Sequence, residues 1–408
     1  MGKPEIRFKG FTDDWEQRKV TELGEIYIGL VTTMTAHYTD KGALLIRNSD
    51  IRDGYFEFGD NPIYLDEEFV EQNSSRKHQV GDVITVHTGD IGTSAVITEN
   101  EAGSIGFATI VTRPDTKKII PKYLCAYLNT DTHKRFAMRI STGDGRNNYN
   151  LKDYYNCVVP FPNLEEQRKI SDYIQSINHL ITLHQRKCDE VKTLKKYMLQ
   201  KMFPQNGMNV PEIRFSGFTD VWEQRKWIDT VDISTEMVDP TSGEYDDMPH
   251  IAPGNIESFT GRLLDNVKTV KEEQLISGKF RFRPDDVVYG KINPQLGKYF
   301  YARVDGLTSA DAYVFKGKNG TTQKFLFSLL QTREFFKYSV SVSKRSGMPK
   351  INRDELNAYI FLEPSEEEQD KIGSFLLNID HLITLHQRKC DELRKMKKFM
   401  LQNMFPKD

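Results

Sequence analysis

Two long stretches of the chain have apolar residues at alternating spacings of four and three, as expected for a coiled-coil seam. The first seam begins with Ile170, Ile174, Ile177 and Ile181, and the second begins with Ile372, Leu376, Ile379 and Ile383. A period of 3.5 kept over this length predicts helices of about 38 residues, roughly 57 Å long. Because one helix cannot bury its own apolar stripe, we expect the two helices to pack on each other.

The helical pattern is part of a larger repeat. The stretch HLITLHQRKCDE occurs unchanged at His179–Glu190 and at His381–Glu392. The lead-in PEIRFKGFTDDWEQRK at Pro4–Lys19 returns at Pro211–Lys226 with two differences in sixteen positions. The chain is therefore a tandem duplication, and its repeat of about 200 residues is far too long for a solenoid unit. We expect segments at 1–162, 163–206, 207–364 and 365–408, in which a globular body and a long helix alternate.

The two variable bodies have the same order of patterns. Runs rich in β-formers, at Asp82–Val86 and Ser94–Thr98, precede a helix-like apolar pattern at Lys122–Thr130. The second body repeats that order with Asp286–Tyr289, Tyr299–Ala302 and Lys324–Thr332. The bodies are therefore expected to share an α/β fold and to differ in their surface loops.

The ends of the repeats suggest how the helices run. Pro204 leads through a short linker to Pro211, whereas Pro406 ends a chain whose own lead-in starts at Pro4. Joining the ends would give a circle of two equal units, which predicts a pseudo-twofold axis, antiparallel helices and neighbouring termini.

Composition narrows the class of protein without deciding it. The 408 residues carry a net charge of −2 and are 38% hydrophobic, so any site for a polyanion must be local. No apolar run reaches the roughly 20 residues of a membrane span, and the N-terminus lacks the apolar core of a signal peptide. We expect a cytoplasmic protein with no membrane contact, whose four cysteines are reduced.

Three polar, glycine-containing loops occur at corresponding places in each body. They mix Arg and Lys with Asn, Gln and Thr, the side chains that pair with phosphates and with base edges in the major groove. Ordinary solvated turns have a similar composition, so one loop alone decides little. The candidate DNA-binding residues are Arg47, Asn48, Thr88, Arg146, Asn147, Asn148, Tyr149, Asn255, Lys291, Asn293, Gln295, Lys344, Arg345 and Lys350.

This layout resembles the specificity subunit of type I restriction–modification systems. The resemblance rests on the lead-in, on the run from Pro162 through Glu165-Glu166-Gln167 to Ile170, on the long helix, and on the repetition of all three. It covers essentially the whole chain. The fold it implies is α+β, with two globular α/β target recognition domains joined by two long helices packed as an antiparallel coiled coil.

The resemblance also implies function and partners. Each recognition domain would read one half of a bipartite double-stranded DNA target, and the helices would set the spacing and dock two modification (methyltransferase) subunits. Restriction subunits would join that complex. S-adenosylmethionine and ATP would bind those partner subunits, and no cofactor or metal would bind this chain. Pro294 departs from the usual loop pattern, so the contacts of the second body are harder to assign.

The residues themselves point away from catalysis. The chain has no Pro-Pro pair for a methyltransferase base pocket, and neither a G-x-G-x-x-G nor a G-x-x-x-x-G-K-[ST] loop. Arg113-Pro114-Asp115 and Arg283-Pro284-Asp285 have carboxylates suited to a nuclease, but Pro-Asp is an ordinary turn dipeptide.

Two alternatives remain open from the sequence. His184, Cys188, His386 and Cys390 form a zinc ligand set if the helices bring them together, although buried seam residues explain the same spacing. A non-catalytic coiled-coil scaffold that binds protein partners is the second candidate function, and a lack of any DNA sequence preference would favour it.

Overall fold

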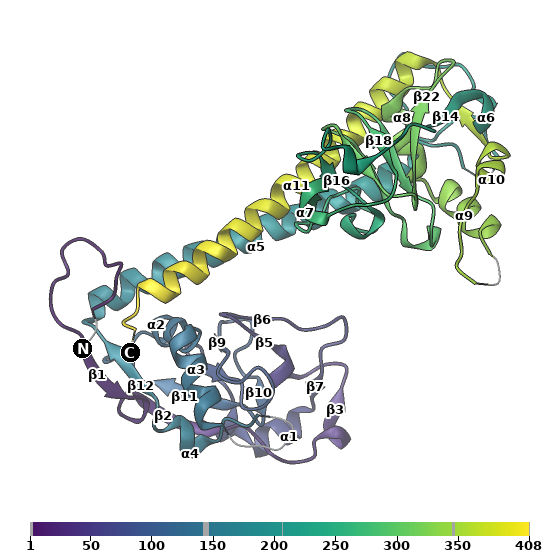
Figure 1. The fold of residues 1–408 in the computed structure, drawn as a ribbon. Coiled ribbons are helices and arrows are strands. Elements are labelled where there is room, and N and C mark those ends of the chain that lie inside the picture. Colours follow the sequence, from purple (N-terminus) through teal and green to yellow (C-terminus); the bar gives the residue numbers. More distant parts are fainter. Residues whose placement is uncertain (1–2, 142–146, 206, 345–346, 408) are drawn as a thin grey trace. The chain divides into compact units, whose positions relative to one another are not determined.

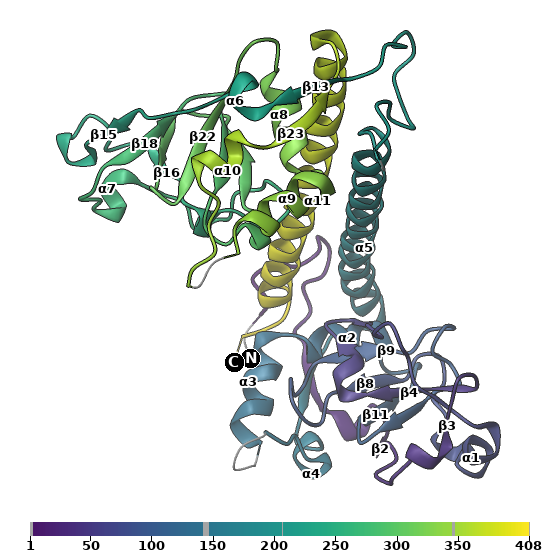
Figure 2. The ribbon, with the colours of Figure 1, turned by 90° about the vertical axis from the view of Figure 1, so that its right-hand side faces the viewer.

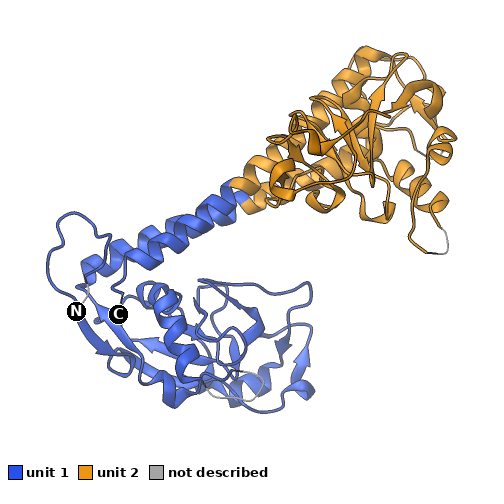
Figure 3. Cartoon of the chain, in the orientation of Figure 1, with its two compact units in different colours: residues 1–184, 389–408 blue, residues 185–388 orange. Residues whose placement is uncertain are grey.

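The computed structural model describes residues 3–141, 147–205, 207–344 and 347–407, which form two compact units (Figure 3). Unit 1 comprises residues 1–184 and 389–408, and unit 2 comprises residues 185–388. Each unit contains one globular body and part of both long helices.

The two predicted long helices are confirmed. Helix α5 spans Leu164–Lys201 and helix α11 spans Glu366–Asn403, each with 38 residues (Figure 1). In unit 1 the Cys390 thiol donates to the Ile181 carbonyl oxygen at 3.6 Å, and Ile170 shares a core with Leu401. Later residues of one helix thus lie beside earlier residues of the other, so the two helices are antiparallel in this unit.

Unit 2 has the same helix pairing. The Cys188 thiol lies 3.9 Å from the Ile383 carbonyl oxygen, and Lys195 forms an ion pair with Asp380. As α5 advances, its partner residues in α11 again decrease in number, so the helices are antiparallel here too.

The body of unit 1 is built on a four-stranded sheet with the order β2-β11-β8-β9 and a second one with the order β10-β4-β7-β3. Strand β1 pairs with β12, and β5 pairs with β6. The strands are β1 Glu16–Lys19, β2 Gly24–Ile28, β3 Tyr38–Thr39, β4 Ala43–Arg47, β5 Ile51–Arg52, β6 Tyr55–Phe56, β7 Tyr64–Leu65, β8 Val83–Thr85, β9 Ser94–Val96, β10 Ile105–Phe107, β11 Ile110–Pro114 and β12 Val158–Phe161. The helices are α1 Glu67–Gln72, α2 Pro121–Leu128, α3 Asp131–Ile140 and α4 Leu151–Tyr154.

The body of unit 2 repeats the central sheet as β14-β22-β19-β20 and adds a five-stranded sheet, β15-β18-β21-β16-β17, while β13 pairs with β23. The strands are β13 Glu223–Lys226, β14 Val231–Ile233, β15 Met237–Val238, β16 Pro249–His250, β17 Lys268–Thr269, β18 Lys279–Phe282, β19 Val287–Gly290, β20 Tyr299–Tyr301, β21 Gly306–Thr308, β22 Ala312–Gly317 and β23 Ile360–Glu363. The helices are α6 Trp227–Thr230, α7 Val270–Glu273, α8 Gln323–Leu330, α9 Arg333–Val342 and α10 Arg353–Asn357. The α+β class and the duplication are therefore confirmed at the level of sheet order.

Each long helix is joined to a body by the Glu-Glu-Gln motif near its start. Glu166 accepts two hydrogen bonds from the Arg7 guanidinium of the lead-in, at 2.7 and 2.9 Å. The next residue, Gln167, accepts from the Ile120 backbone N–H and donates to the Pro162 carbonyl oxygen, both at 2.9 Å. We call this arrangement the lead-in clasp.

Unit 2 has the same clasp. Arg214 donates to both carboxylate oxygens of Glu368 at 2.7 Å, and Gln369 accepts from the Thr322 backbone N–H at 2.8 Å. Gly373 in α11 is needed for this packing, since a Cβ there would lie 2.5 Å from the Lys324 Cβ.

In unit 1 the two chain ends lie together (Figures 1 and 2). The Ile6 backbone N–H donates to the Asn403 carbonyl oxygen at 2.9 Å. In unit 2 the Ile213 N–H donates to the Lys201 carbonyl oxygen at 2.9 Å, so the internal linker occupies the place that the termini occupy in unit 1.

Two other features are absent from the described residues. None of their helices is both long and apolar enough to cross a bilayer. They also contain no group of three or more His, Cys, Asp or Glu side chains placed to hold a metal ion. Cys188 and Cys390 are buried in the helix seam with their thiols directed at carbonyl oxygens.

Candidate nucleic-acid interface

The three loops predicted in the first body meet in unit 1. The Asn48 side chain accepts from the His87 backbone N–H at 2.7 Å and donates to the Ala108 carbonyl oxygen at 3.1 Å. The Thr88 hydroxyl donates to Asn148 Oδ1 at 2.9 Å. That bond orients the Asn148 amide with its NH₂ group turned away from Thr88. Loops from distant parts of the sequence therefore form one polar cluster, which we call loop cluster 1.

Other candidates in this body differ in how freely they could reach a ligand. Arg47 is held by Asp50 of its own loop through bonds of 2.8 and 3.0 Å, and these bonds raise the pKa of its guanidinium. Asn147 is half-buried, with its Nδ2 3.5 Å from the Met138 sulfur. Arg146 lies outside the described residues.

Tyr149 is not at the surface, which corrects its prediction as a DNA contact. Its side chain is fully buried, and its ring packs edge-on against Tyr154 at 5.6 Å. Its backbone N–H donates to the His87 carbonyl oxygen at 2.8 Å, as the Ile351 N–H does to Lys291 at 3.1 Å. Tyr149 and Ile351 thus occupy equivalent core positions, and a buried aliphatic counterpart indicates packing rather than recognition.

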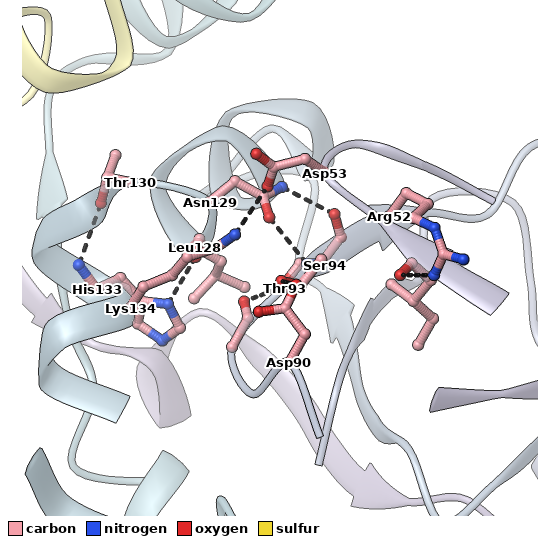
Figure 4. A network of polar contacts seen from close by, with 12 residues as sticks. Arg52, Asp53, Asp90, Thr93, Ser94, Leu128, Asn129, Thr130, His133 and Lys134 are labelled. Carbon is pink, nitrogen blue, oxygen red and sulfur yellow. Dashed lines mark hydrogen bonds and ion pairs between the residues drawn. The ribbon is translucent and has the colours of Figure 1, made fainter. Parts of the chain in front are cut away.

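Loop cluster 1 rests on a network of polar contacts (Figure 4). Asn129, at the end of α2, accepts from the Ser94 backbone N–H at 2.9 Å and donates to the Ser94 carbonyl oxygen at 2.8 Å. The Thr93 hydroxyl donates to Asp90 at 2.7 Å. His133 Nδ1 lies 2.7 Å from the Leu128 carbonyl oxygen. These contacts fix the base of the His87–Gly92 loop.

The predicted loops of the second body also meet, in unit 2. The Asn293 backbone N–H donates to the Pro349 carbonyl oxygen at 2.8 Å, and Ile292 and Lys350 form a β-bridge. That bridge occupies the place of the bridge between Thr88 and Asn148 in unit 1. We call this arrangement loop cluster 2.

Asn255 supports a turn instead of facing a ligand, which corrects a second prediction. It is 7% exposed, and its Oδ1 accepts from the Ala252 backbone N–H at 2.9 Å. In unit 1 the Arg47 backbone N–H donates to Asp50 at 2.9 Å in the same way. Asn255 is therefore the counterpart of buried Asp50.

Lys291 belongs to a cationic group that sequence reasoning found only in part. Its ammonium lies 5.1 Å from the Tyr313 ring centroid, and the Arg353 guanidinium lies 5.8 Å from the same ring. Burial lowers the pKa of Lys291, and the charges of Lys350 and Arg353 lower it further. Arg353 and Tyr313 were missed because they lie on α10 and β22, outside the polar loops.

The remaining candidates of the second body are Asn293, Gln295, Lys344 and Arg345. Gln295 and Lys344 are exposed, and Asn293, with a φ of 48°, precedes a short 3-10 helix that begins at Pro294. Proline suits the first position of a helical turn, so Pro294 shapes this loop without breaking it. Arg345 lies outside the described residues.

The two loop clusters have one geometry and different chemistry. Cluster 1 contains mostly neutral amide and hydroxyl groups, from Asn48, Thr88 and Asn148. Cluster 2 presents cations at the equivalent places, with Lys291 where unit 1 has His87 and Lys350 where it has Asn148. The molecule is thus a duplicated α+β protein with two diversified polar loop clusters on one scaffold.

Comparison with known proteins assigns the family. The sequence profile described as "Type I restriction modification DNA specificity domain" matches residues 12–193 and 221–395. The chain belongs to this family, which confirms the resemblance drawn from the lead-in, the Glu-Glu-Gln motif and the repeated helix.

Individual relatives agree with that assignment over different lengths. The EcoDI specificity subunit of Escherichia coli is 32% identical over 151 residues, which cover 37% of this chain and 33% of that protein. The MjaVIII specificity subunit of Methanocaldococcus jannaschii is 22% identical over 312 residues, or 71% of each protein. The matches to EcoDI and to the EcoBI subunit of Escherichia coli span only 33% and 28% of those proteins.

The fold is also that of a solved relative. The crystal structure of the type I restriction–modification S subunit from M. genitalium superposes with a TM-score of 0.70 over 100% of both chains, at 11% sequence identity. At that identity the likeness concerns the fold alone.

Proposed function

We propose that this chain is the DNA sequence-specificity subunit of a type I restriction–modification enzyme, in which each body reads one half of a bipartite target. The observation that carries the proposal is the pair of loop clusters, equivalent in geometry and unlike in chemistry. A duplicated scaffold with two identical surfaces would favour identical half-sites, whereas these two surfaces favour different ones.

The chemistry of the clusters suits base recognition. An Asn amide pairs in two-point fashion with the N6 and N7 edge of adenine, and a Lys or Arg pairs with the O6 and N7 edge of guanine. Loop cluster 1 offers the NH₂ group of Asn148, and loop cluster 2 offers Lys350 beside Lys291. The other polar groups of both clusters would contact phosphates and fix the position on DNA.

The long helices supply a surface for partners. Exposed apolar side chains recur at equivalent positions of both helices, so unit 1 contains Leu180, Leu183, Met396 and Phe399, and unit 2 contains Leu194, Tyr197, Leu382 and Leu385. We call each set a helix patch. Two equivalent patches suit two copies of one partner, and we assign them to two modification subunits. A restriction subunit would join that complex.

The proposal assigns no chemistry to this chain. Methyl transfer to adenine N6, with its S-adenosylmethionine, and ATP-driven restriction would belong to the partner subunits. The near-neutral charge of the chain supports this division, because phosphate neutralisation supplies much of DNA affinity and the partners would have to supply part of it.

Selection from random double-stranded DNA tests the function. The chain mixed with its methyltransferase partner should enrich a sequence with two short specified parts and an unspecified spacer. Enrichment of no sequence would instead favour a protein-binding scaffold. Methyl transfer by the purified chain alone would contradict the non-catalytic assignment.

A further inference from the structure

Two cations of loop cluster 2 lie at places where loop cluster 1 has neutral side chains. Lys291 takes the place of His87, and Lys350 takes the place of Asn148. Burial lowers the pKa of His87 from its ordinary value, so its imidazole is neutral at pH 7. The position of Lys291 is therefore charged in unit 2 and uncharged in unit 1.

Arg353 is a third cation beside this cluster, and it also has a neutral equivalent. It is the first residue of α10, just as Leu151 is the first residue of α4. Leu151 packs against the core of unit 1, whereas the Arg353 guanidinium lies 5.8 Å from the Tyr313 ring centroid. On the neighbouring strand, Tyr313 takes the place that Ile110 has in unit 1. Unit 2 thus has a cation and an aromatic ring where unit 1 has two aliphatic side chains.

Arg353 is fixed by hydrogen bonds to neutral groups. Its Nη1 and Nη2 donate to the carbonyl oxygens of Ile233 at 3.2 Å and of Ser234 at 3.1 Å. A guanidinium has five N–H donors, so three remain for a ligand. The Lys291 ammonium lies 5.1 Å from the centroid of Tyr313, the same ring that the Arg353 guanidinium lies over. Both cations are thus held in place without neutralisation of their charge.

These cations also lack carboxylate partners. Among the described residues, no carboxylate forms an ion pair with Lys291, Lys350 or Arg353. Burial lowers the pKa of Lys291, and the Asp311 carboxylate opposes that effect. The charges of Lys350 and Arg353 lower the same pKa, and its net shift is downward. An anion bound between these cations would relieve their mutual repulsion.

The corresponding loops of unit 1 have their positive charge paired within the chain. In the described residues of these three loops, the one lysine or arginine is Arg47. Its guanidinium donates to the buried Asp50 carboxylate at 2.8 and 3.0 Å. Lys291 and Arg353 in unit 2 have no such partner, so the two bodies differ in the charge that they offer to a polyanion.

We infer that Lys291 and Arg353 bind phosphates of the DNA backbone, so that unit 2 anchors DNA at two places where unit 1 does not. This inference rests on the proposed function, because it takes loop cluster 2 to face DNA. Phosphate oxygens accept from the remaining Arg353 donors and from the Lys291 ammonium, and Lys350 is left to read a base. Phosphate contacts fix position and affinity but not sequence, so Lys291 and Arg353 are positioning residues.

The salt dependence of DNA binding measures contacts of this kind. Each phosphate that a cation neutralises releases counterions and changes the slope of log K against log salt by about 0.9. A neutral imidazole, amide or hydroxyl group neutralises no phosphate. The slope should therefore depend on Lys291 and Arg353, and it should not depend on His87, which takes the place of Lys291 in unit 1.

Equilibrium binding of the full chain with its methyltransferase partner, followed by fluorescence anisotropy at about 50 to 200 mM salt, tests the inference. The DNA probes are the selected target and an unrelated duplex. Lys291→Ala and Arg353→Ala should each reduce the slope by about 0.9 and should weaken binding to both duplexes alike. His87→Ala should keep the slope of the unaltered chain. Arg353→Lys retains a cation and should keep that slope as well.

The slope separates a phosphate contact from a structural role. A structural role of Arg353 would lower the free energy of unfolding in Arg353→Ala without a change in slope. Unchanged slopes in Lys291→Ala and in folded Arg353→Ala would overturn the inference. Lys291→Ala alone decides if Arg353→Ala fails to fold. A reduction in His87→Ala as large as that in Lys291→Ala would overturn it too.

These outcomes are distinguishable from a failure of the proposed function. Each of them leaves the enrichment of a bipartite target by the unaltered complex intact. Failure of that complex to enrich any sequence would refute the proposed function instead, and the slopes on the unrelated duplex would still report the phosphate contacts of Lys291 and Arg353.

Discussion

Position 133 illustrates how a single residue gives the two bodies different chemistry on one scaffold. His133 is fully buried on α3, and its Nε2 lies 3.2 Å from the Tyr149 hydroxyl. Its equivalent on α9 is Phe335, which packs among aromatic rings in unit 2. Unit 1 therefore contains a titratable group where unit 2 has a hydrocarbon.

This difference predicts that unit 1 is the more sensitive to acid. Burial lowers the pKa of His133 to about 4 and that of buried His78 to about 4, from the ordinary 6.5. Because the histidine pKa is lower in the folded state than in the unfolded state, the free energy of unfolding is highest above pH 6.5. It decreases as the pH falls from 6.5 toward 4. The loss approaches about 3 kcal/mol for each histidine, since one unit corresponds to about 1.4 kcal/mol.

Urea unfolding followed between pH 7.5 and 4.5 measures this loss. His133→Phe should lower the free energy of unfolding at pH 7.5, because the Leu128 carbonyl and the Tyr149 hydroxyl lose a hydrogen-bond partner. The same substitution should make the free energy of unfolding less dependent on pH. The same steep pH dependence in His133→Phe and in the unaltered chain would contradict the prediction.

Single side chains in the loop clusters should affect one half-site each. Asn148→Ala is expected to relax base preference in the half-site read by unit 1, and Lys350→Ala in the other half-site. Each should cost about 1–3 kcal/mol of discrimination, as measured for two-point base contacts. Competition binding with single-base variants of the target, in the presence of the partner, gives these values. Relaxation of both half-sites by either substitution would refute the assignment of one body to one half-site.

Sequence reasoning located the loops correctly but could not separate recognition from support within them. Tyr149 and Asn255 stand in polar, glycine-containing segments, yet one completes a core and the other holds a turn. An amide that binds its own backbone and one that faces solvent have the same composition. Only the comparison of the two units, which pairs Tyr149 with Ile351 and Asn255 with Asp50, distinguishes them.

At the scale of elements, the lead-in clasp explains why both lead-ins and both Glu-Glu-Gln motifs retain the same residues. The Glu166 side chain is 1% exposed and the Arg7 side chain 14% exposed. Removal of one charge from a buried pair leaves the other uncompensated, which costs about 3–5 kcal/mol.

We therefore expect Glu166→Gln to destabilise unit 1 by about that amount and Glu368→Gln to destabilise unit 2 similarly. The effect in unit 1 should be somewhat larger, because the Trp15 indole also donates to Glu166 at 3.1 Å whereas the Trp222 indole N–H has no acceptor in the described structure. Glu165→Gln is the matched control, since Glu165 is exposed and forms an ion pair with Lys169 at 3.3 Å. Equal unfolding free energies for Glu165→Gln and Glu166→Gln would contradict the role of the clasp.

The helices were the most predictable elements. A 3.5-residue period, the absence of proline and an exact repeat fixed their extent, and the observed α5 and α11 differ from the expected ranges only at the ends. The short strands of the second sheets were not foreseen. Several have two residues, and strands that short carry too few positions to show an alternating pattern.

At the scale of the whole molecule, the proposed function implies that the length of the two helices sets the distance between the half-sites. An insertion of seven residues after Gln185 and another after Gln387 preserves the seam, because seven residues are two coiled-coil turns. Each insertion lengthens its helix by roughly 10.5 Å, which corresponds to about 3 base pairs of DNA.

The selected target of the lengthened chain should therefore keep both half-sites and gain about 3 base pairs of spacer. An insertion in α5 alone should disrupt the seam and abolish binding. An unchanged spacer in the doubly lengthened chain would show that the helices do not set the distance.

The central claim is that each body reads its own half-site, and an exchange of bodies tests it most directly. A chain in which residues 227–364 are replaced by a second copy of residues 20–162 has two identical bodies on antiparallel helices. Selection from random double-stranded DNA with the methyltransferase partner should then return an inverted repeat of the half-site assigned to unit 1, with the original spacer. Recovery of the original asymmetric target, or of no bipartite sequence from a folded chain, would contradict the account.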